Sequence, residues 1–120
     1  MKVYYIALTM SSTRQNKIER LLQKDLGDIF QKGTTTLFKG KMITVTKVRI
    51  SPDLSSARAY LSLFPVEDKK EFIDYINTIE GQIRFDLGKR VRHQLRKVPS
   101  LSFFVDDSLD YIDNIDKLLK

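Results

Sequence analysis

The chain has 120 residues, of which 42% are hydrophobic and 30% are charged, with a net charge of +6 and no cysteine. This length supports one folded domain with a single core, and the composition excludes an intrinsically disordered protein. The absence of cysteine excludes disulfides, thiolate metal sites and cysteine nucleophiles, while the positive charge favours an anionic partner.

The first ten residues, MKVYYIALTM, are apolar but too short to span a bilayer, and they lack the cleavage pattern of a secretory signal. They are either an extra edge strand or sequence upstream of a natural start at Met10. We favour the second alternative because a helix start signal follows at once. We therefore expect an N-terminal extension at residues 1–10 and one domain over residues 11–120.

A first helix is expected from Ser12 to about Gln31, because Ser12 and Gln15 have the spacing of a capping box. Its apolar face consists of Ile18, Leu21, Leu22, Leu26, Ile29 and Phe30. Its polar face consists of Arg14, Lys17, Arg20, Gln23 and Lys24. Gly33 and a run of threonines end this helix, and a loop extends to Lys41.

Two strands follow. Residues 42–50 alternate between apolar and polar with one change of phase around Thr46 and Lys47, which indicates a β-bulge or a two-sided strand. Ser51, Pro52 and Asp53 are typical of a turn. The next strand should bury Ala57, Ala59, Leu61 and Leu63 and direct Arg58, Tyr60, Ser62 and Phe64 to the opposite face. The two strands are predicted to form an antiparallel hairpin.

A long helical run follows Pro65, with acidic residues in its first turn. Its apolar residues Phe72, Ile76 and Ile79 continue into a second stripe of Ile83, Leu87, Val91 and Leu95. Gly81 interrupts the run and is unfavourable in a helix interior. We therefore expect a kink near Glu80 and Gly81, and a second helix that ends at Pro99.

The second helix is strongly basic. Its stretch from Gly81 to Pro99 has one acid, Asp86, against the cations Arg84, Lys89, Arg90, Arg92, Arg96 and Lys97. One face can pack while the other presents cations, which suits binding to a phosphate backbone because bound Lys and Arg release condensed counterions. A solvated helix face without a partner is the alternative. An acidic membrane surface is less favoured, because this helix has no Trp and its apolar stripe is better explained as core.

The chain closes with a β-prone run, LSFFV, and a helix capped by Asp106, Asp107 and Ser108. The apolar stripe of that helix is Leu109, Ile112, Ile115 and Leu119. The order of elements predicts an α+β fold with helices on one face of a three-stranded mixed sheet. The other face should be at least partly open and carry Lys47, Arg49, Arg58 and Tyr60.

The sequence gives little support for a catalytic site. His93 is the single histidine, so no histidine pair can bind a metal, and a phosphate contact or plain exposure is favoured over general-base catalysis. Asp106 and Asp107 resemble a Mg²⁺ nuclease site less than they resemble helix caps. Phe85, Phe103 and Phe104 could stack on bases, but core packing is favoured. We expect no enzyme, no metal and no cofactor.

Three segments resemble bacterial ribosome-binding factor A: ITVTKVRISPDLSSARAYLSLF, EGQIRFDLGKRVRHQLRKVPSLSFFVDDS and the closing IDKLL. The similarity covers residues 12–119. It implies a type-II KH domain that lacks the Gly-x-x-Gly loop of ordinary KH modules. In place of that loop the family has an Ala-x-Gly kink, which falls here on Ile79, Glu80 and Gly81. Gly81 keeps the family pattern, whereas Ile79 departs from it.

The resemblance implies a small ribosomal subunit assembly factor. Such a factor binds immature or free 30S subunits and 16S rRNA in the cytoplasm, and assists late maturation and rRNA end processing without catalysis. An assembly GTPase that releases it is also implied. The alternative is a protein-interaction module that docks a basic partner through its acidic last helix. We expect a monomer that does not bind membranes. The expected RNA-binding residues are Arg84, Lys89, Arg90, Arg92, His93, Arg96 and Lys97, with Lys47, Arg49 and Arg58.

Overall fold

A computed structural model describes residues 13–33, 38, 40–64 and 66–106. Within these residues, three strands form a mixed sheet in the order β1-β2-β3. The strands are β1 (Met42–Ile50), β2 (Ser56–Phe64) and β3 (Ser100–Val105). β1 pairs antiparallel with β2, and β2 pairs parallel with β3. The predicted hairpin and mixed sheet are therefore confirmed.

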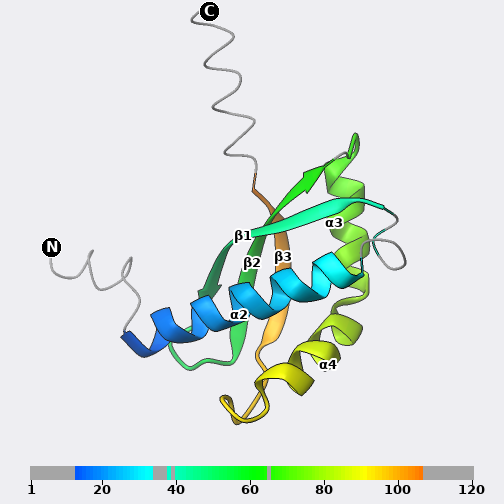
Figure 1. Cartoon of the computed structure of the whole chain (residues 1–120). Helices are drawn as coiled ribbons and strands as arrows, with labels where there is room; N and C mark the ends of the chain where they lie inside the picture. The colour runs from blue at the N-terminus through cyan, green and yellow to red at the C-terminus, as the bar shows by residue number, and fades with distance from the viewer. Residues whose placement is uncertain (1–12, 34–37, 39, 65, 107–120) are drawn as a thin grey trace, which may run out of the picture.

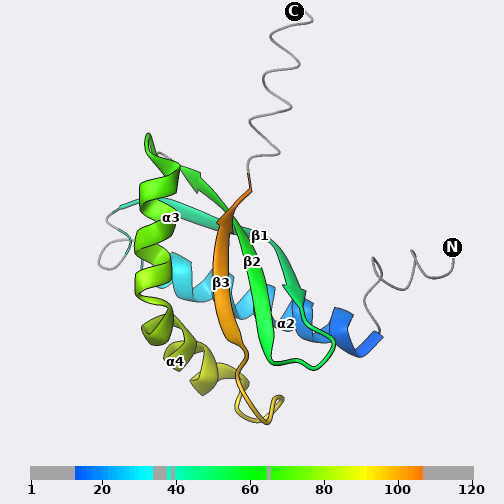
Figure 2. The same cartoon turned by 180° about the vertical axis from the view of Figure 1, so that it is seen from behind.

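In the described part of the chain, three helices pack on one face of this sheet. They are α2 (Thr13–Lys32), α3 (Lys69–Thr78) and α4 (Glu80–Val91). α2 crosses the sheet over β1 and contacts α4, while α3 packs beside β3 (Figure 1). From behind, the sheet lies in front of the helices, and no described helix covers it (Figure 2). The α+β architecture with one open sheet face agrees with the prediction.

The core lies between α2, the kinked helix pair and the covered sheet face. The predicted inward residues of β2 are all buried, from Ala57 to Leu63 at every second position. The ring of Phe30 in α2 lies at its centre, with ring centroids 5.0 Å from Phe38 and 5.7 Å from Phe103. Helix, loop and third strand thus meet at one aromatic cluster, which holds α2 against the sheet.

The change of phase in β1 is a β-bulge. Val45 lies opposite Leu61 and Lys47 lies opposite Tyr60, so Thr46 is the extra residue. The bulge keeps Val48 and Ile50 facing the core while Lys47 faces outward. The predicted irregularity around Thr46 and Lys47 is therefore confirmed, and it is a β-bulge.

Side chains of α2 cover the outer edge of β1. Gln15, Glu19 and Gln23 follow one another at intervals of four residues, so they share one side of the helix. Gln15 Nε2 donates to Ile50 O at 3.2 Å, Glu19 Oε2 accepts from Ile50 N at 2.9 Å, and Gln23 Nε2 donates to Val45 O at 3.1 Å. Gln23, which was predicted on the polar face of the helix, is half-buried and satisfies a backbone group of the edge strand.

The helical run breaks at Ile79, whose φ of −101° and ψ of 18° end α3 and begin α4. Gly81 lies inside the first turn of α4, and a Cβ on it would meet nothing within 4 Å. The break therefore does not depend on glycine there. Ile79 itself is half-buried and packs against the core, which gives its large side chain a place in the kink.

Side chains on both sides of the kink hold the outer edge of β3. Asn77 Oδ1 accepts from Phe103 N at 2.9 Å, and Asn77 Nδ2 donates to Phe103 O at 3.0 Å. Glu80 Oε1 accepts from Leu101 N at 3.0 Å. These hydrogen bonds fix the position of β3 relative to the ends of α3 and α4 that meet at the kink.

The prediction that the basic helix reaches Pro99 was wrong. α4 ends at Val91, whose carbonyl accepts from the N–H groups of both Gln94 and Leu95. The chain then folds back, and Val98 Cγ2 lies 3.2 Å from where a Cβ on Gly88 would be. This close approach, together with the hydrogen bond from Ser100 N to Ser55 O that starts β3, requires the helix to end early.

Some predictions fall on residues that the structure does not describe. These are the N-terminal extension at residues 1–10, the cap at Ser12, the threonine run at 34–36 and the last helix from Asp107 onward.

Candidate nucleic-acid interface

The exposed cations at the end of α4 and in the loop after it form the α4 basic surface, which we define as Lys89, Arg92, Arg96 and Lys97. In α4, Ile83, Leu87 and Val91 are buried at intervals of four residues, and Lys89 lies on the exposed side of the helix. Among the described residues, no carboxylate forms an ion pair with any of these four cations. Within the described part of the chain, the surface therefore presents positive charge that no carboxylate pairs with.

Two of these cations have neighbours that orient them. Lys89 Nζ lies 4.5 Å from the centre of the Phe85 ring, and Arg92 Nε donates to His93 Nε2 at 3.3 Å. His93 is exposed, so its ring can act as an acceptor for Arg92 without being part of the core. Neither neighbour neutralises a charge, and both cations can meet an anion.

Arg90 has a different role from the rest of the predicted set. Its Nη1 lies 3.4 Å from Asp28 Oδ2 and 4.0 Å from Asp25 Oδ1, both on α2. The side chain is 27% exposed. Arg90 thus links α4 to α2, and its charge is largely occupied. Arg84, also predicted, is half-buried in α4.

The other predicted cations, Lys47, Arg49 and Arg58, lie on the open face of the sheet, away from the helices. Arg49 Nη1 lies 3.6 Å from Glu19 Oε1 at the sheet edge, and Arg49 stands directly opposite Arg58 in the ladder. The structure therefore divides the exposed predicted cations between two surfaces, with Arg90 and the kink residues on neither.

Two aromatic residues of the open face were not predicted as site residues. Tyr60 and Phe104 are ladder partners, and their rings stack with centroids 5.7 Å apart. Phe104 is 42% exposed and Phe85 is 64% exposed, so their assignment to the core was wrong, whereas Phe103, at 1%, is core as expected. The alternation in SFFV already placed Phe103 and Phe104 on opposite faces, which was the signal available for Phe104.

The turn between β1 and β2 carries a fixed negative charge. Asp53 Oδ1 accepts from the hydroxyls of Ser51 at 2.7 Å and Ser55 at 2.8 Å, and from the backbone N–H of Ser55. These hydrogen bonds, the Ser51 hydroxyl first, lower the pKa of Asp53 to about 2. Leu54 completes the turn with a φ of +63°. The carboxylate is thus built into the turn and is not available for proton transfer near neutral pH.

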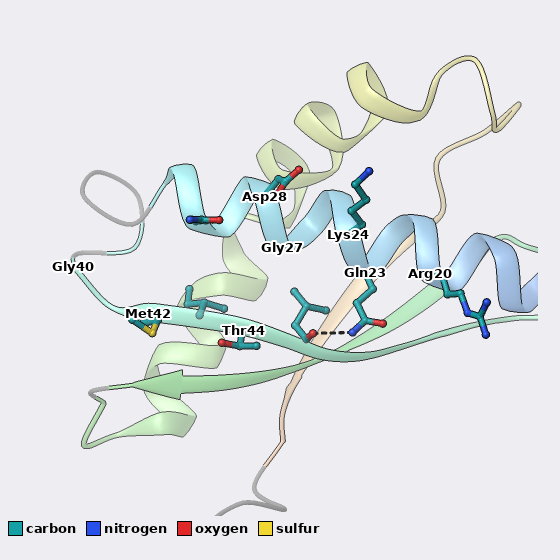
Figure 3. A pocket seen from close by; sticks show the side chains of 11 residues that line it. Arg20, Gln23, Lys24, Gly27, Asp28, Gly40, Met42 and Thr44 are labelled. Carbon is teal, nitrogen blue, oxygen red and sulfur yellow. Dashed lines mark hydrogen bonds between the residues drawn. The ribbon is translucent and has the colours of Figure 1, made fainter.

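A pocket of about 820 Å³ lies between α2 and the first half of β1 (Figure 3). Gln23 reaches across it to Val45 O, and Arg20, Lys24 and Asp28 line its α2 side. None of the predicted site residues lines this pocket. It therefore does not contribute to the candidate interface.

Residues 13–33, 38, 40–64 and 66–106 contain no cluster of three or more His, Cys, Asp or Glu residues able to hold a metal ion. No helix within the same residues is long and apolar enough to cross a membrane.

Comparison with known proteins identifies close relatives. Residues 14–119 match the family model for ribosome-binding factor A. The chain is 51% identical over 110 residues to ribosome-binding factor A of Christiangramia forsetii, covering 91% of this chain and 84% of that protein. It is 48% identical over 115 residues to ribosome-binding factor A of Flavobacterium johnsoniae, covering 92% and 85%.

Solved structures share the fold. The crystal structure of ribosome-binding factor A from Thermus thermophilus superposes with a TM-score of 0.63 at 25% identity, covering 76% of this chain and 94% of that one. A homology model of the Thermus thermophilus protein, fitted into a cryo-electron microscopy map of a 30S complex, gives a TM-score of 0.61 at 27% identity, with coverages of 76% and 93%.

Proposed function

Because the chain belongs to the ribosome-binding factor A family, we propose that it binds the small ribosomal subunit and contacts 16S rRNA through the α4 basic surface. The observation that carries this proposal is the set of four exposed cations on α4 and its loop that have no carboxylate partner among the described residues. The complex of the Thermus thermophilus relative with the 30S subunit supports the choice of partner.

The role proposed is that of a binding factor in late maturation of the subunit and in processing of the rRNA ends, without catalysis. The sequence supports a non-catalytic role, because its single histidine, His93, accepts from Arg92 through Nε2 and is not paired with a nucleophile in the sequence pattern. A factor that acts by binding needs only charge and shape complementarity to RNA. The cytoplasm is the compartment that follows from a ribosomal partner.

Arg84, His93, Lys47, Arg49 and Arg58 are proposed as weaker contributors to RNA binding. Arg84 is half-buried, and Arg49 is partly compensated by Glu19. Arg90 contributes mainly through packing, because its guanidinium lies between two carboxylates of α2. Removal of charge from Arg90 would therefore confuse a loss of binding with a loss of stability.

The test is sedimentation with purified small subunits across a salt series. We expect wild type to co-migrate with free small subunits and to dissociate as salt rises, because neutralised phosphates release counterions. The variant Arg92→Glu/Arg96→Glu should bind more weakly, and its salt dependence should be flatter by about one unit of slope for each lost phosphate contact.

A matched control is Lys24→Glu/Lys70→Glu, which makes the same charge change at exposed positions of α2 and α3. It should reduce binding less than the α4 variant at every salt concentration. Equal loss in the two variants would show that net charge alone governs binding. Failure of wild type to co-migrate at low salt would refute the ribosomal partner itself.

A further inference from the structure

The open face of the sheet carries a compact group of aromatic and cationic side chains, which we call the sheet platform: Lys47, Arg58, Tyr60 and Phe104. Lys47 is the ladder partner of Tyr60, and Tyr60 is the ladder partner of Phe104, so all three strands contribute. No described helix lies over this face, as the rear view shows (Figure 2).

The two rings stand in a defined arrangement. Their planes are inclined by 30° and their centroids are 5.7 Å apart, so they form one continuous aromatic surface. Lys47 Nζ lies 5.6 Å from the Tyr60 ring and Arg58 Cζ lies 6.0 Å from the Phe104 ring. Each ring therefore has a cation at the distance of a cation–π contact, which holds the side chains in place.

The core does not require these rings. Phe103, the neighbour of Phe104, supplies the buried aromatic group of β3 at 1% exposure, while Phe104 is 42% exposed. Arg58 also stands directly opposite Arg49 in the ladder, and like charges in that arrangement are unfavourable. An aromatic pair on the open face, with Phe104 exposed and Tyr60 half-buried, beside two opposed cations is explained by an anionic partner that has flat apolar faces.

We propose that the sheet platform binds single-stranded RNA, with an unpaired base stacked on Phe104 and Tyr60 and the adjoining phosphates beside Lys47, Arg58 and Arg49. Stacking of bases on aromatic side chains and a positively charged surface along the backbone are the two components of single-strand recognition. A duplex cannot use the rings in this way, because its bases are already stacked on each other.

Asp106 borders the sheet platform at the end of β3. Asp106 accepts a hydrogen bond from Thr46 Oγ1 at 2.5 Å, and Asp106 N donates to Leu61 O at 2.7 Å, so its carboxylate is held at the end of β3 and engaged by Thr46. This places a negative charge at one end of the face. The bound strand is therefore expected to run toward Arg49 and Arg58 rather than toward Asp106.

The proposal relies on the proposed function only for the class of partner, since it concerns a different surface from α4. The test uses the full chain and a fluorescently labelled single-stranded RNA of about eight nucleotides, a length within the usual site size of such surfaces. A hairpin duplex of the same composition serves as the second probe. Binding is measured by fluorescence anisotropy at two salt concentrations.

The informative variants are Phe104→Leu, which removes the ring but keeps apolar bulk, and Phe104→Tyr, which keeps the ring. We expect Phe104→Leu to bind the single strand about 5- to 100-fold more weakly, the range for loss of one stacked base. The factor should be the same at both salt concentrations, because stacking releases no counterions. Phe104→Tyr should bind as wild type does, and duplex binding should be unchanged in both variants.

The matched control is Phe64→Leu, which removes an exposed ring (68% exposed) from the far end of β2. It should leave single-strand affinity unchanged. Equal affinity of wild type and Phe104→Leu for the single strand would refute the proposal, and so would an equal loss in Phe64→Leu.

The outcome is separable from that of the proposed function. If wild type binds the single strand and Phe104→Leu does not, the platform is supported. If wild type also fails to co-migrate with small subunits, the ribosomal assignment alone is refuted. Co-migration with subunits by a wild-type chain that shows no single-strand binding would refute the platform alone.

Discussion

Arg90 Nη1 lies 3.4 Å from Asp28 Oδ2, so the cation at the middle of the basic sequence connects two helices. The guanidinium also lies 4.0 Å from Asp25 Oδ1, whose side chain is only 14% exposed. In the folded protein, Arg90 therefore pairs with carboxylates of α2, and its charge adds little to the positive charge that is available to bind RNA. Counting cations along the chain overestimates the charge available for binding by at least this residue.

Reversal of this charge should destabilise the fold. We expect Arg90→Glu to lower the free energy of unfolding by about 1–2 kcal/mol, because it replaces an attraction with repulsion from two carboxylates in a partly buried contact. Urea denaturation measures the change. The control Arg92→Glu, exposed two residues further on, should change stability by less than about 0.5 kcal/mol. Equal effects would contradict the structural role of Arg90.

The hydrogen bonds from the kink to β3 should be separable by amide exchange. Asn77→Ala removes the acceptor for Phe103 N, and Glu80→Ala removes the acceptor for Leu101 N. We expect each variant to accelerate exchange at its own amide while the other amide stays protected, because each N–H loses a specific partner. NMR hydrogen exchange measures both in one spectrum. Equal acceleration of the two amides in both variants would mean that the strand edge opens as a unit.

Gly27, inside α2, and Gly33, directly after its end, should respond to alanine in opposite directions. A Cβ on Gly33 would lie 2.6 Å from the ring of Phe38, which is fully buried and cannot move aside. We expect Gly33→Ala to destabilise the protein by about 1–3 kcal/mol through overpacking. At Gly27, inside α2, a Cβ would meet nothing within 4 Å, and Gly27→Ala should stabilise it by about 0.5–1 kcal/mol. Thermal unfolding of both variants checks the contrast.

The turn carboxylate should make a pH-dependent contribution to stability. The pKa of Asp53 is lowered from 3.8 to about 2 in the folded protein, so the folded state favours the charged form. The stabilisation that the Asp53 carboxylate provides is fully present at pH values above its pKa in the unfolded chain, 3.8. This stabilisation is lost as the pH falls from about 4 to about 2. We expect Asp53→Asn to destabilise the protein at pH 6 and to have little effect at pH 2. Carboxyl chemical shifts followed through the acid range measure the pKa directly, and a midpoint near 3.8 would contradict the turn geometry.

Local patterns predicted the hairpin because its signals are local. The change of phase at Thr46 and the turn at Pro52 are visible in the sequence, and the structure places the bulge and the turn at those residues. The stripe from Ile83 to Val91 likewise predicted the buried side of α4. In these cases the periodicity of apolar residues determines which side of the element is covered.

The end of α4 could not be predicted in this way. Leu95 continues the four-residue spacing, and no helix-breaking residue intervenes before Pro99. The helix stops at Val91 because Val98 must pack against Gly88 and Ser100 must reach Ser55, and both contacts depend on the rest of the fold. The pairing of Arg90 with α2 is of the same kind, since its partner Asp28 lies 62 residues away in the sequence.

The positive charge of the candidate site was predicted from the sequence, but the arrangement of its aromatic side chains was not. The exposed cations of α4 follow from their spacing between buried residues, whereas the stacked pair of Tyr60 and Phe104 depends on the parallel register of β2 and β3. That register joins residues more than 40 positions apart, and no pattern within either strand specifies it. The exposure of Phe104 was predictable from alternation, but its partner was not.

The polar side chains along the outer edges of the sheet also determine how the molecule can associate. At Val45 and Ile50, backbone groups that a foreign strand would need are already bonded to α2, and at Leu101 and Phe103 such groups are bonded to the kink. Strand addition, a common route to domain swapping and fibril growth, would require these bonds to break first at both edges. The sheet is therefore closed to lateral extension at these positions, and partners must approach its open face or the helices.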